Sequence, residues 1–299
     1  MGIPAAMHLP ARSSTEVESH HVLVDGVRHH YLRAGNGPPL VLLHGTAIDS
    51  ATLSYGPSLP ALAQHHTVIA LDWPGYGLSE RPGVEMTMAD FVTLLTDFLE
   101  AIGLEKAHLA GFSMGGAVAL GLALQAPERF ETLTLIGSYG LDARAPVPLL
   151  PYIAMRAPRL SATVSWGMRR SRLLTRLVLT RIVFSDPRLV TDELVAAVHE
   201  QLKAPEAERS FVAWLRSEIR PFGFGTSYEP QLNELAVPTL LLHGRKDRVV
   251  QWRKAARASE RIPDARLMVV PGCGHWVMRE APDVFVGELL GYTGGGYVP

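Results

Sequence analysis

A chain of 299 residues, 47% of them hydrophobic and 19% charged, can bury a large core, which excludes an intrinsically disordered protein. Lys and Arg number 28 against 29 Asp and Glu, so the net charge of −1 creates no field that would attract a nucleic acid. Residues 1–17 lack the apolar core of a signal peptide, and no apolar run reaches the roughly 18 residues of a membrane span. The sequence therefore predicts a cytoplasmic protein with no membrane span.

The single cysteine, Cys273, excludes a framework of internal disulfides. Its position two residues before His275 makes it a candidate nucleophile, but a small buried side chain is the simpler interpretation. The histidines show no metal-ligand spacing with cysteine or acidic residues, and no phosphate-binding glycine motif is complete. We therefore expect no metal and no cofactor.

Apolar runs alternate with helical patterns along most of the chain. The predicted strands are the runs at residues 19–34, which form a hairpin around Asp25-Gly26, then 40–43, 67–71, the run beginning at 107, 133–136, 239–242 and 266–270. The predicted helices are the segments at about 51–64, 88–102, 252–262 and 281–292. This alternation predicts a mostly parallel sheet with helices on both faces and ligands at its carboxyl edge.

From Leu141 to Glu229 this alternation stops, and prolines and long helical segments follow. We predict an inserted helical cap at residues 141–229, core segments at 19–140 and 230–299, and an N-terminal tail at 1–18. Residues 156–181 of the cap carry seven arginines and no acid. Two interpretations stay open: a basic amphipathic surface for lipid headgroups or an acidic substrate, or a helix with its arginines in solvent.

The run Gly111-Phe112-Ser113-Met114-Gly115 fits the G-x-S-x-G nucleophile elbow, since it follows an apolar run and precedes a small-residue helix. In such an elbow the serine backbone is strained, and the residues two positions away on each side must lack a Cβ. Gly111 and Gly115 meet this demand, and the first helical amides would point toward whatever the serine attacks. Ser113 is therefore the candidate nucleophile.

A serine nucleophile needs a histidine base and a carboxylate that orients the base. Asp247 lies just beyond the predicted strand at 239–242, and His275 lies in a glycine-rich loop just beyond the last predicted strand. Asp72 also follows a strand, but it precedes the serine in the chain. The order Ser, Asp, His favours Asp247 as the acid.

Five motifs, HGTA, DWPGYGLS, GFSMGG, HGRKD and GCGHW, occur in an order similar to that of the α/β-hydrolase superfamily. The resemblance covers nearly the whole chain outside residues 1–18. It implies an α/β-hydrolase fold, with a mostly parallel eight-stranded sheet, helices on both faces and an inserted α-helical cap. It also implies Ser113 as nucleophile, His275 as general base and then acid, and Asp247 as the orienting carboxylate.

The resemblance further implies an oxyanion hole made by the backbone amide of Met114 and an amide from the HGTA turn. Thr46 is the first choice for the second amide and Ala47 the alternative. His44 and His243 are interpreted as structural histidines that tie their turns to neighbouring backbone.

Serine at the elbow argues against epoxide hydrolases and haloalkane dehalogenases, which use aspartate there. Carboxylesterases, lactonases, perhydrolases, proline iminopeptidases and hydrolases of meta-cleavage products remain. The SMGG and CGHW motifs are similar to the last group, which cleaves carbon-carbon bonds. Its members usually have Asn before the nucleophile and a cap arginine that grips an acidic dienoate. This chain has Phe112 there and no arginine at 192–199, although Arg209 and Arg216 lie further along.

We therefore expect hydrolysis of carboxylic esters with small to medium acyl chains, bound beneath an apolar cap. Phe112 and Trp276 either line that pocket or only pack beside it. A non-catalytic binder, known elsewhere in the superfamily, is disfavoured because all three members of the triad are present. The expected partner is a small-molecule ester, and a homodimer is compatible with the sequence.

Overall fold

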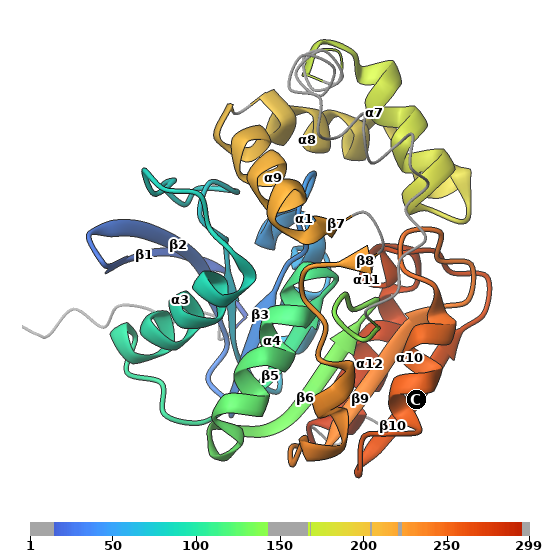
Figure 1. Ribbon diagram of the computed structural model, residues 1–299. Helices are drawn as coiled ribbons and strands as arrows, with labels where there is room; N and C mark the ends of the chain where they lie inside the picture. Colours follow the sequence, from blue (N-terminus) through green and yellow to red (C-terminus); the bar gives the residue numbers. More distant parts are fainter. Residues whose placement is uncertain (1–14, 143–166, 168, 204, 221–222, 295–299) are drawn as a thin grey trace, which may run out of the picture.

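The computed structural model describes residues 15–142, 167, 169–203, 205–220 and 223–294. Eight strands form one sheet in the order β1-β2-β4-β3-β5-β6-β9-β10 (Figure 1). They are β1 (Glu18–Val24), β2 (Val27–Ala34), β3 (Pro39–Leu43), β4 (Thr67–Leu71), β5 (Ala107–Phe112), β6 (Phe130–Ile136), β9 (Thr239–Gly244) and β10 (Ala265–Val270). Strand β2 is antiparallel to β1 and to β4, and all other neighbours are parallel. The predicted mostly parallel sheet of eight strands is confirmed.

The first two strands form a tight hairpin. Asp25 and Gly26, the two residues between β1 and β2, both have positive φ, at 49° and 76°. This backbone matches the right-handed twist of paired strands, and Asp-Gly is one of the few pairs that adopts it at low cost. The predicted hairpin is therefore confirmed.

Helices cover both faces of the sheet. Together with those that lie beyond its carboxyl edge, the described helices are α1 (Ala51–Tyr55), α2 (Leu59–Leu62), α3 (Met88–Ala101), α4 (Met114–Gln125), α7 (Arg172–Val178), α8 (Asp192–Lys203), α9 (Pro205–Glu218), α10 (Trp252–Ser259), α11 (Val277–Glu280) and α12 (Pro282–Tyr292). Shorter helical turns are η1 (Pro127–Arg129), η2 (Leu179–Val183), η3 (Pro187–Leu189) and η4 (Glu229–Glu234).

Side chains alternate across β3 because strand residues point to opposite faces in turn. Val41 and Leu43 belong to the apolar cluster beneath α3, α4 and α10, while Leu40 and Leu42 belong to the cluster beneath α1, α2 and α12. All four side chains are fully buried. The central strands are therefore apolar throughout, as parallel strands covered on both faces must be.

The single helix predicted at about 51–64 is wrong, because the structure has two short helices there, α1 and α2. Gly56 ends α1, and Pro57 has no N–H with which to continue the hydrogen-bond ladder. The next helix begins after Ser58, whose N–H donates to the carbonyl of Tyr55 at 2.8 Å. The apolar periodicity continues through residues 56–58, so the sequence pattern does not reveal the break between the two helices.

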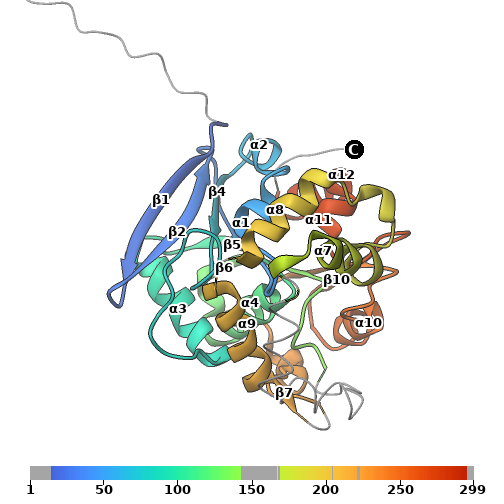
Figure 2. The same cartoon turned by 90° about the horizontal axis from the view of Figure 1, so that it is seen from above.

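Helices α7, α8 and α9 and the turn η2, which we call the cap helices, lie across the carboxyl edge of the sheet (Figures 1 and 2). After α9, the two-residue strands β7 (Ile219–Arg220) and β8 (Gly223–Phe224) form a small separate hairpin, which the sequence did not indicate. The division into core and cap at residues 141 and 229 stays a prediction.

Much of the arginine-rich segment, residues 156–166 and 168, lies outside the described residues. Within the described part, the side chains of Arg172 and Arg181 are exposed, and Arg176 forms an ion pair with Asp192. Contact with lipid stays untested. Across the described ranges, none of the helices is both long enough and apolar enough to cross a membrane.

Candidate active site

Ser113 stands at a sharp turn between β5 and α4, with φ at 53° and ψ at −114°. A Cβ on Gly111 would lie 2.3 Å from the carbonyl oxygen of Gly115. A Cβ on Gly115 would lie 2.5 Å from the carbonyl oxygens of Leu43 and His44. Both distances are impossible for real atoms, so only glycine fits on either side of the strained serine. The backbone here has the shape that the G-x-S-x-G pattern predicts.

The three side chains predicted as a triad lie in one hydrogen-bonded line. The Oγ atom of Ser113 lies 3.2 Å from Nε2 of His275, and Nδ1 of His275 lies 2.7 Å from Oδ2 of Asp247. Because Asp247 accepts a hydrogen bond from the N–H at Nδ1 of His275, the lone pair of Nε2 faces the serine hydroxyl. The backbone N–H of His275 also donates to the carbonyl of Val183 in η2 at 2.8 Å, so a cap turn holds the loop that carries the histidine.

Asp247 is buried and its two oxygens accept several hydrogen bonds. Oδ1 accepts the backbone N–H groups of Val249 and Val250 at 2.7 and 2.9 Å, and His243 contacts Oδ2 at 3.1 Å. Burial by itself raises the pKa of Asp247, but the adjacent His275 and the hydrogen bonds from His243 and His275 outweigh it. The net effect holds this pKa well below its usual range, so the side chain is a carboxylate at neutral pH.

Two backbone amides near the serine are free to bind an oxyanion. The N–H groups of Met114 and Thr46 donate to no acceptor within the described ranges. The N–H of Ala47 instead lies 3.4 Å from the hydroxyl oxygen of Tyr76, which also makes a 2.7 Å hydrogen bond with the side chain of Thr46. This difference supports Thr46 over Ala47.

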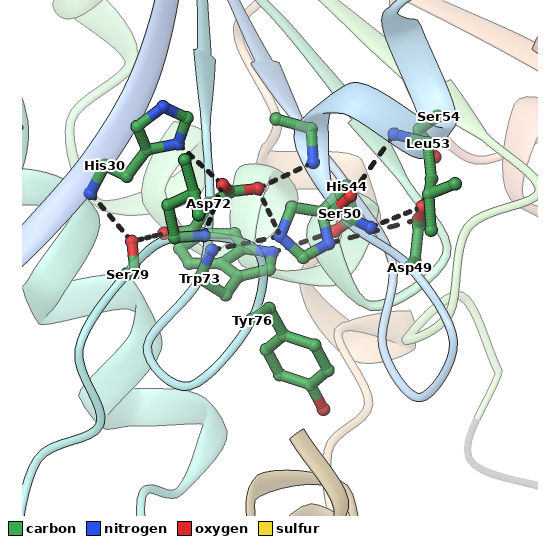
Figure 3. Close-up of polar contacts among 12 residues, drawn as sticks. His30, His44, Asp49, Ser50, Leu53, Ser54, Asp72, Trp73, Tyr76 and Ser79 are labelled. Carbon is green, nitrogen blue, oxygen red and sulfur yellow. Dashed lines mark hydrogen bonds and ion pairs between the residues drawn. The ribbon is translucent and has the colours of Figure 1, made fainter. Parts of the chain in front are cut away.

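Asp72, the rejected alternative for the acid, does not contact Ser113 or His275 among the described hydrogen bonds and lies in the polar network that Figure 3 shows. Its Oδ2 contacts Nδ1 of His30 at 2.7 Å, and its Oδ1 accepts the N–H of Ala51 at 2.8 Å. His44 contacts the backbone on both sides of its ring, accepting from the N–H of Trp73 at 3.0 Å and donating to the carbonyl of Gly45 at 2.8 Å. These contacts support the interpretation of His44 as structural.

A cavity of about 410 Å³ lies between the sheet edge and the cap helices. Most of its wall is apolar, and no lysine or arginine is among the described residues that line it. The lining residues are Thr46, Ala47, Ile48, Asp49, Phe112, Ser113, Tyr139, Val178, Ile182, Val183, Phe211, Trp214, Leu215, Phe224, Val249, Val250, His275 and Trp276. The described part of the wall is therefore suited to a largely apolar group next to Ser113.

Phe112 and Trp276 both line this cavity, with their rings parallel and 6.5 Å apart. The Phe112 ring centre also lies 4.7 Å from that of His275. Arg209 and Arg216, considered as cap arginines that could grip an acid, have exposed side chains and are absent from the cavity wall. The structure thus brings both predicted aromatic residues to the site and neither arginine.

Cys273 is buried, with 3% of its surface exposed. Burial, with help from Glu280 and Asp247, raises the pKa of its thiol to about 12. A thiol of this kind is protonated at neutral pH and is a poor nucleophile. These observations favour a packing role. Among the described residues, no group of three or more His, Cys, Asp or Glu side chains is arranged to hold a metal ion.

The sequence analysis missed two residues close to the turn at Gly45 and Thr46, namely Asp49 and Tyr76. Asp49 lines the cavity, and the hydroxyl of Tyr76 makes a hydrogen bond with the side chain of Thr46. A signal for Asp49 was present, since an acid lies four residues after Gly45 in a turn that leaves a fully buried strand. An acid in such a place needs hydrogen-bond donors, and free backbone amides of the turn supply them.

The model of a family described as alpha/beta hydrolase fold matches residues 38–282, so the chain belongs to this family. The chain is 28% identical, over 96% of its length and 94% of the relative's, to 2-hydroxy-6-oxo-6-(2'-aminophenyl)hexa-2,4-dienoic acid hydrolase of Metapseudomonas resinovorans. It is 31% identical, over 90% and 92% of the two chains, to 2-hydroxymuconate semialdehyde hydrolase of Pseudomonas sp. (strain CF600).

A third relative, pimeloyl-[acyl-carrier protein] methyl ester esterase of Nitrosomonas europaea, is 30% identical over 86% of this chain and 96% of its own. Among solved structures, a bacterial membrane phospholipase A superposes with a TM-score of 0.78 at 25% identity, covering 94% of this chain and 87% of the other. Hydrolases whose names specify different substrates are therefore similar to this chain, at 25% to 31% identity.

Proposed function

We propose that the chain hydrolyses carboxylic esters of small to medium acyl chains through an acyl-enzyme at Ser113. The observation that carries this proposal is the wall of the 410 Å³ cavity, in which Ser113 and His275 lie among apolar side chains with no described lysine or arginine. An ester has no charge that such a wall would have to neutralise, whereas a free carboxylate would find no lysine or arginine among the described residues of the wall.

In the acylation step, His275 takes the proton of the Ser113 hydroxyl at Nε2 while the serine oxygen attacks the ester carbonyl carbon. The negative charge that develops on the carbonyl oxygen is stabilised by the free N–H groups of Thr46 and Met114. His275 then gives its proton to the leaving alcohol. Asp247 stabilises the imidazolium in between, because its carboxylate stays 2.7 Å from Nδ1.

In the deacylation step, His275 removes a proton from a water molecule, which attacks the acyl carbon bound to Ser113. The same two amides stabilise the second oxyanion, and the proton returns to the serine oxygen as the carboxylic acid leaves. The site needs no further group for either step.

The second candidate is hydrolysis of a carbon-carbon bond in a meta-cleavage product, by the same serine, histidine and aspartate. Two of the three relatives described above have names that specify such acidic dienoates or semialdehydes, so the comparisons support this candidate more than the first. The apolar wall of the cavity, with no lysine or arginine among its described residues, supports ester hydrolysis. Segment 192–199 of the cap has no arginine, its Val198 is buried, and its His199 makes a 3.1 Å hydrogen bond with the hydroxyl of Thr175.

A lactonase or perhydrolase would use the same residues and differs only in the acyl group or the acceptor. A non-catalytic binder is disfavoured, because the nucleophile, the base and the acid are present and in hydrogen-bond contact. A cytoplasmic location and a homodimer stay predictions.

The test measures hydrolysis of para-nitrophenyl esters of increasing acyl length beside a meta-cleavage dienoate, for the wild type and Ser113→Ala. The proposal expects ester turnover that exceeds dienoate turnover and disappears in the variant. Dienoate turnover in excess of ester turnover would establish the second candidate. Wild-type protein that fails to react with a serine-directed fluorophosphonate would contradict both.

A further inference from the structure

Asp49 is a buried acidic side chain that the proposed chemistry does not use directly, and burial raises its pKa. It lies in the turn between β3 and α1, and 2% of its surface is exposed. Its Oδ2 accepts the backbone N–H of Gly45 at 2.7 Å, and its Oδ1 accepts the N–H of Ser50 at 2.8 Å (Figure 3). The hydroxyl of Ser54 lies 2.7 and 2.8 Å from the two oxygens. Every polar neighbour of this carboxylate in these contacts is a donor.

Ser54 connects Asp49 to the loop that carries the histidine. The hydroxyl proton of Ser54 goes to Asp49, and its oxygen accepts the indole N–H of Trp276 at 2.9 Å. Trp276 directly follows His275 in the chain and is 1% exposed. A continuous line of hydrogen bonds therefore joins the base loop to the turn at Gly45, by way of Ser54 and Asp49.

Gly45 is held from both of its peptide groups. Because Nε2 of His44 accepts the N–H of Trp73, the ring proton is on Nδ1, which donates to the Gly45 carbonyl. Asp49 accepts the Gly45 N–H. The next amide along the chain is that of Thr46, which has no acceptor within the described ranges. The Thr46 amide belongs to the same peptide group as the Gly45 carbonyl, which His44 holds, and Asp49 holds the N–H of the peptide group just before it. The direction of the Thr46 amide is therefore set by two successive peptide groups, one held by His44 and the other by Asp49.

We propose that Asp49 is a positioning residue, whose carboxylate fixes the Gly45 turn so that the Thr46 amide faces the oxyanion formed at Ser113. Through Ser54 and Trp276 it also keeps this turn in register with His275. An oxyanion hole is effective only when its donors are oriented before the charge develops, and the 2.7 Å contacts of the Asp49 carboxyl group with the Gly45 N–H and the Ser54 hydroxyl orient this turn. The inference rests on the proposed function of Ser113 as a nucleophile.

The test compares Asp49→Asn with the wild type and with Thr239→Val. Asparagine keeps the shape but replaces one acceptor oxygen with a donor, which meets the N–H and O–H groups around it. Thr239 is buried at the amino end of β9, the opposite edge of the sheet, where its hydroxyl donates to the Val237 carbonyl at 2.7 Å. The control thus removes a buried hydrogen bond away from the site.

The measurements are the rate of labelling by a fluorophosphonate, kcat and KM for a para-nitrophenyl ester, the affinity of an alkyl boronic acid, and the thermal midpoint. Asp49→Asn should lower the labelling rate and kcat by about 10- to 100-fold, with KM changed by less than about threefold. Boronate affinity should fall in the same proportion, because the boronate adduct places an oxygen in the oxyanion hole. Thr239→Val should lower only the thermal midpoint.

Labelling separates this inference from the proposed function, because it needs a reactive serine but no particular substrate. If the wild type is labelled and Asp49→Asn reacts at the same rate per folded molecule, the positioning role is wrong. If Asp49→Asn does not fold, Ser54→Ala replaces it and should lower kcat and boronate affinity by about 3- to 10-fold at unchanged KM. Unchanged kcat in a folded Ser54→Ala would equally contradict the inference.

Discussion

The Nε2 atom of His243 lies 3.1 Å from Oδ2 of Asp247, four residues further along the chain. The same nitrogen lies 2.8 Å from the carbonyl oxygen of Val250, which can only accept, so this nitrogen carries a proton. Asp247 is thus held by its own loop as well as by His275. His275 and Asp247 are therefore held in contact without any substrate.

Replacing His243 with alanine should weaken this alignment. A hydrogen bond to a charged group contributes about 1.5 to 3 kcal/mol, so we expect a stability loss of about that size and a kcat about tenfold lower. Urea unfolding and ester kinetics measure the two effects. His66→Ala is the matched control, since His66 is also a buried imidazole but bonds to Pro38 and Thr293 at the amino edge of the sheet. It should lose stability alone, and an equal loss of kcat in both variants would contradict the argument.

Substituting Gly115 with alanine should be far more damaging than the same change at Gly83. The added Cβ at Gly115 would lie 2.5 Å from two backbone carbonyl oxygens, whereas no atom lies within 4 Å of a Cβ at Gly83. Overpacking against backbone costs about 1 to 3 kcal/mol or more, since the backbone cannot move aside as a side chain can. Thermal unfolding of the two variants checks this, and equal midpoints would show that the elbow relaxes more easily than its geometry indicates.

Cys273 should resist alkylation in the folded protein. Burial raises the pKa of its thiol from 9.0 to about 12, so iodoacetamide at about pH 8.5 meets the unreactive protonated form. The stability that this shift contributes is fully present below the ordinary pKa of 9.0 and is lost as pH rises through about 12. As pH rises from 9.0 to about 12, the free energy of unfolding should therefore fall less for Cys273→Ala than for the wild type. Rapid alkylation of the native protein, at the rate seen in guanidinium, would contradict this.

The sequence was sufficient to place Ser113, Asp247 and His275 together because each follows a parallel strand, and the carboxyl ends of such strands meet at one edge. It was also sufficient for the Asp25-Gly26 turn, where the required backbone restricts the residue types. These predictions rest on local rules with few alternatives.

Other features depend on contacts between distant residues, and the pattern of the sequence could not supply them. The hydrogen bond between Ser54 and Trp276 joins positions 222 residues apart. His243 was interpreted as structural, but which atoms it contacts depends on the path of the loop after β9. The break between α1 and α2 was indicated by Gly56 and Pro57, and there the apolar periodicity was given too much weight.

Ile182 offers a direct test of where the acyl chain lies. Its side chain is 47% exposed and also lines the cavity, so it is at the border between cavity and solvent. A tryptophan there has solvent on one side and should be tolerated, while filling space that a long acyl chain would use. We expect Ile182→Trp to lower kcat/KM at least about tenfold for a dodecanoyl ester and less than about threefold for an acetyl ester, as the loss of a few buried methylenes implies.

The matched control is Leu177→Trp, because Leu177 is similarly exposed, at 42%, but is absent from the cavity wall. That variant should leave the chain-length profile unchanged. If both variants alter the profile alike, the effect comes from the outer surface of the cap helices rather than from the cavity. If neither does, the acyl chain does not pass Ile182, and the remaining apolar wall, at Phe211, Trp214 and Leu215 of α9, becomes the place to look for it.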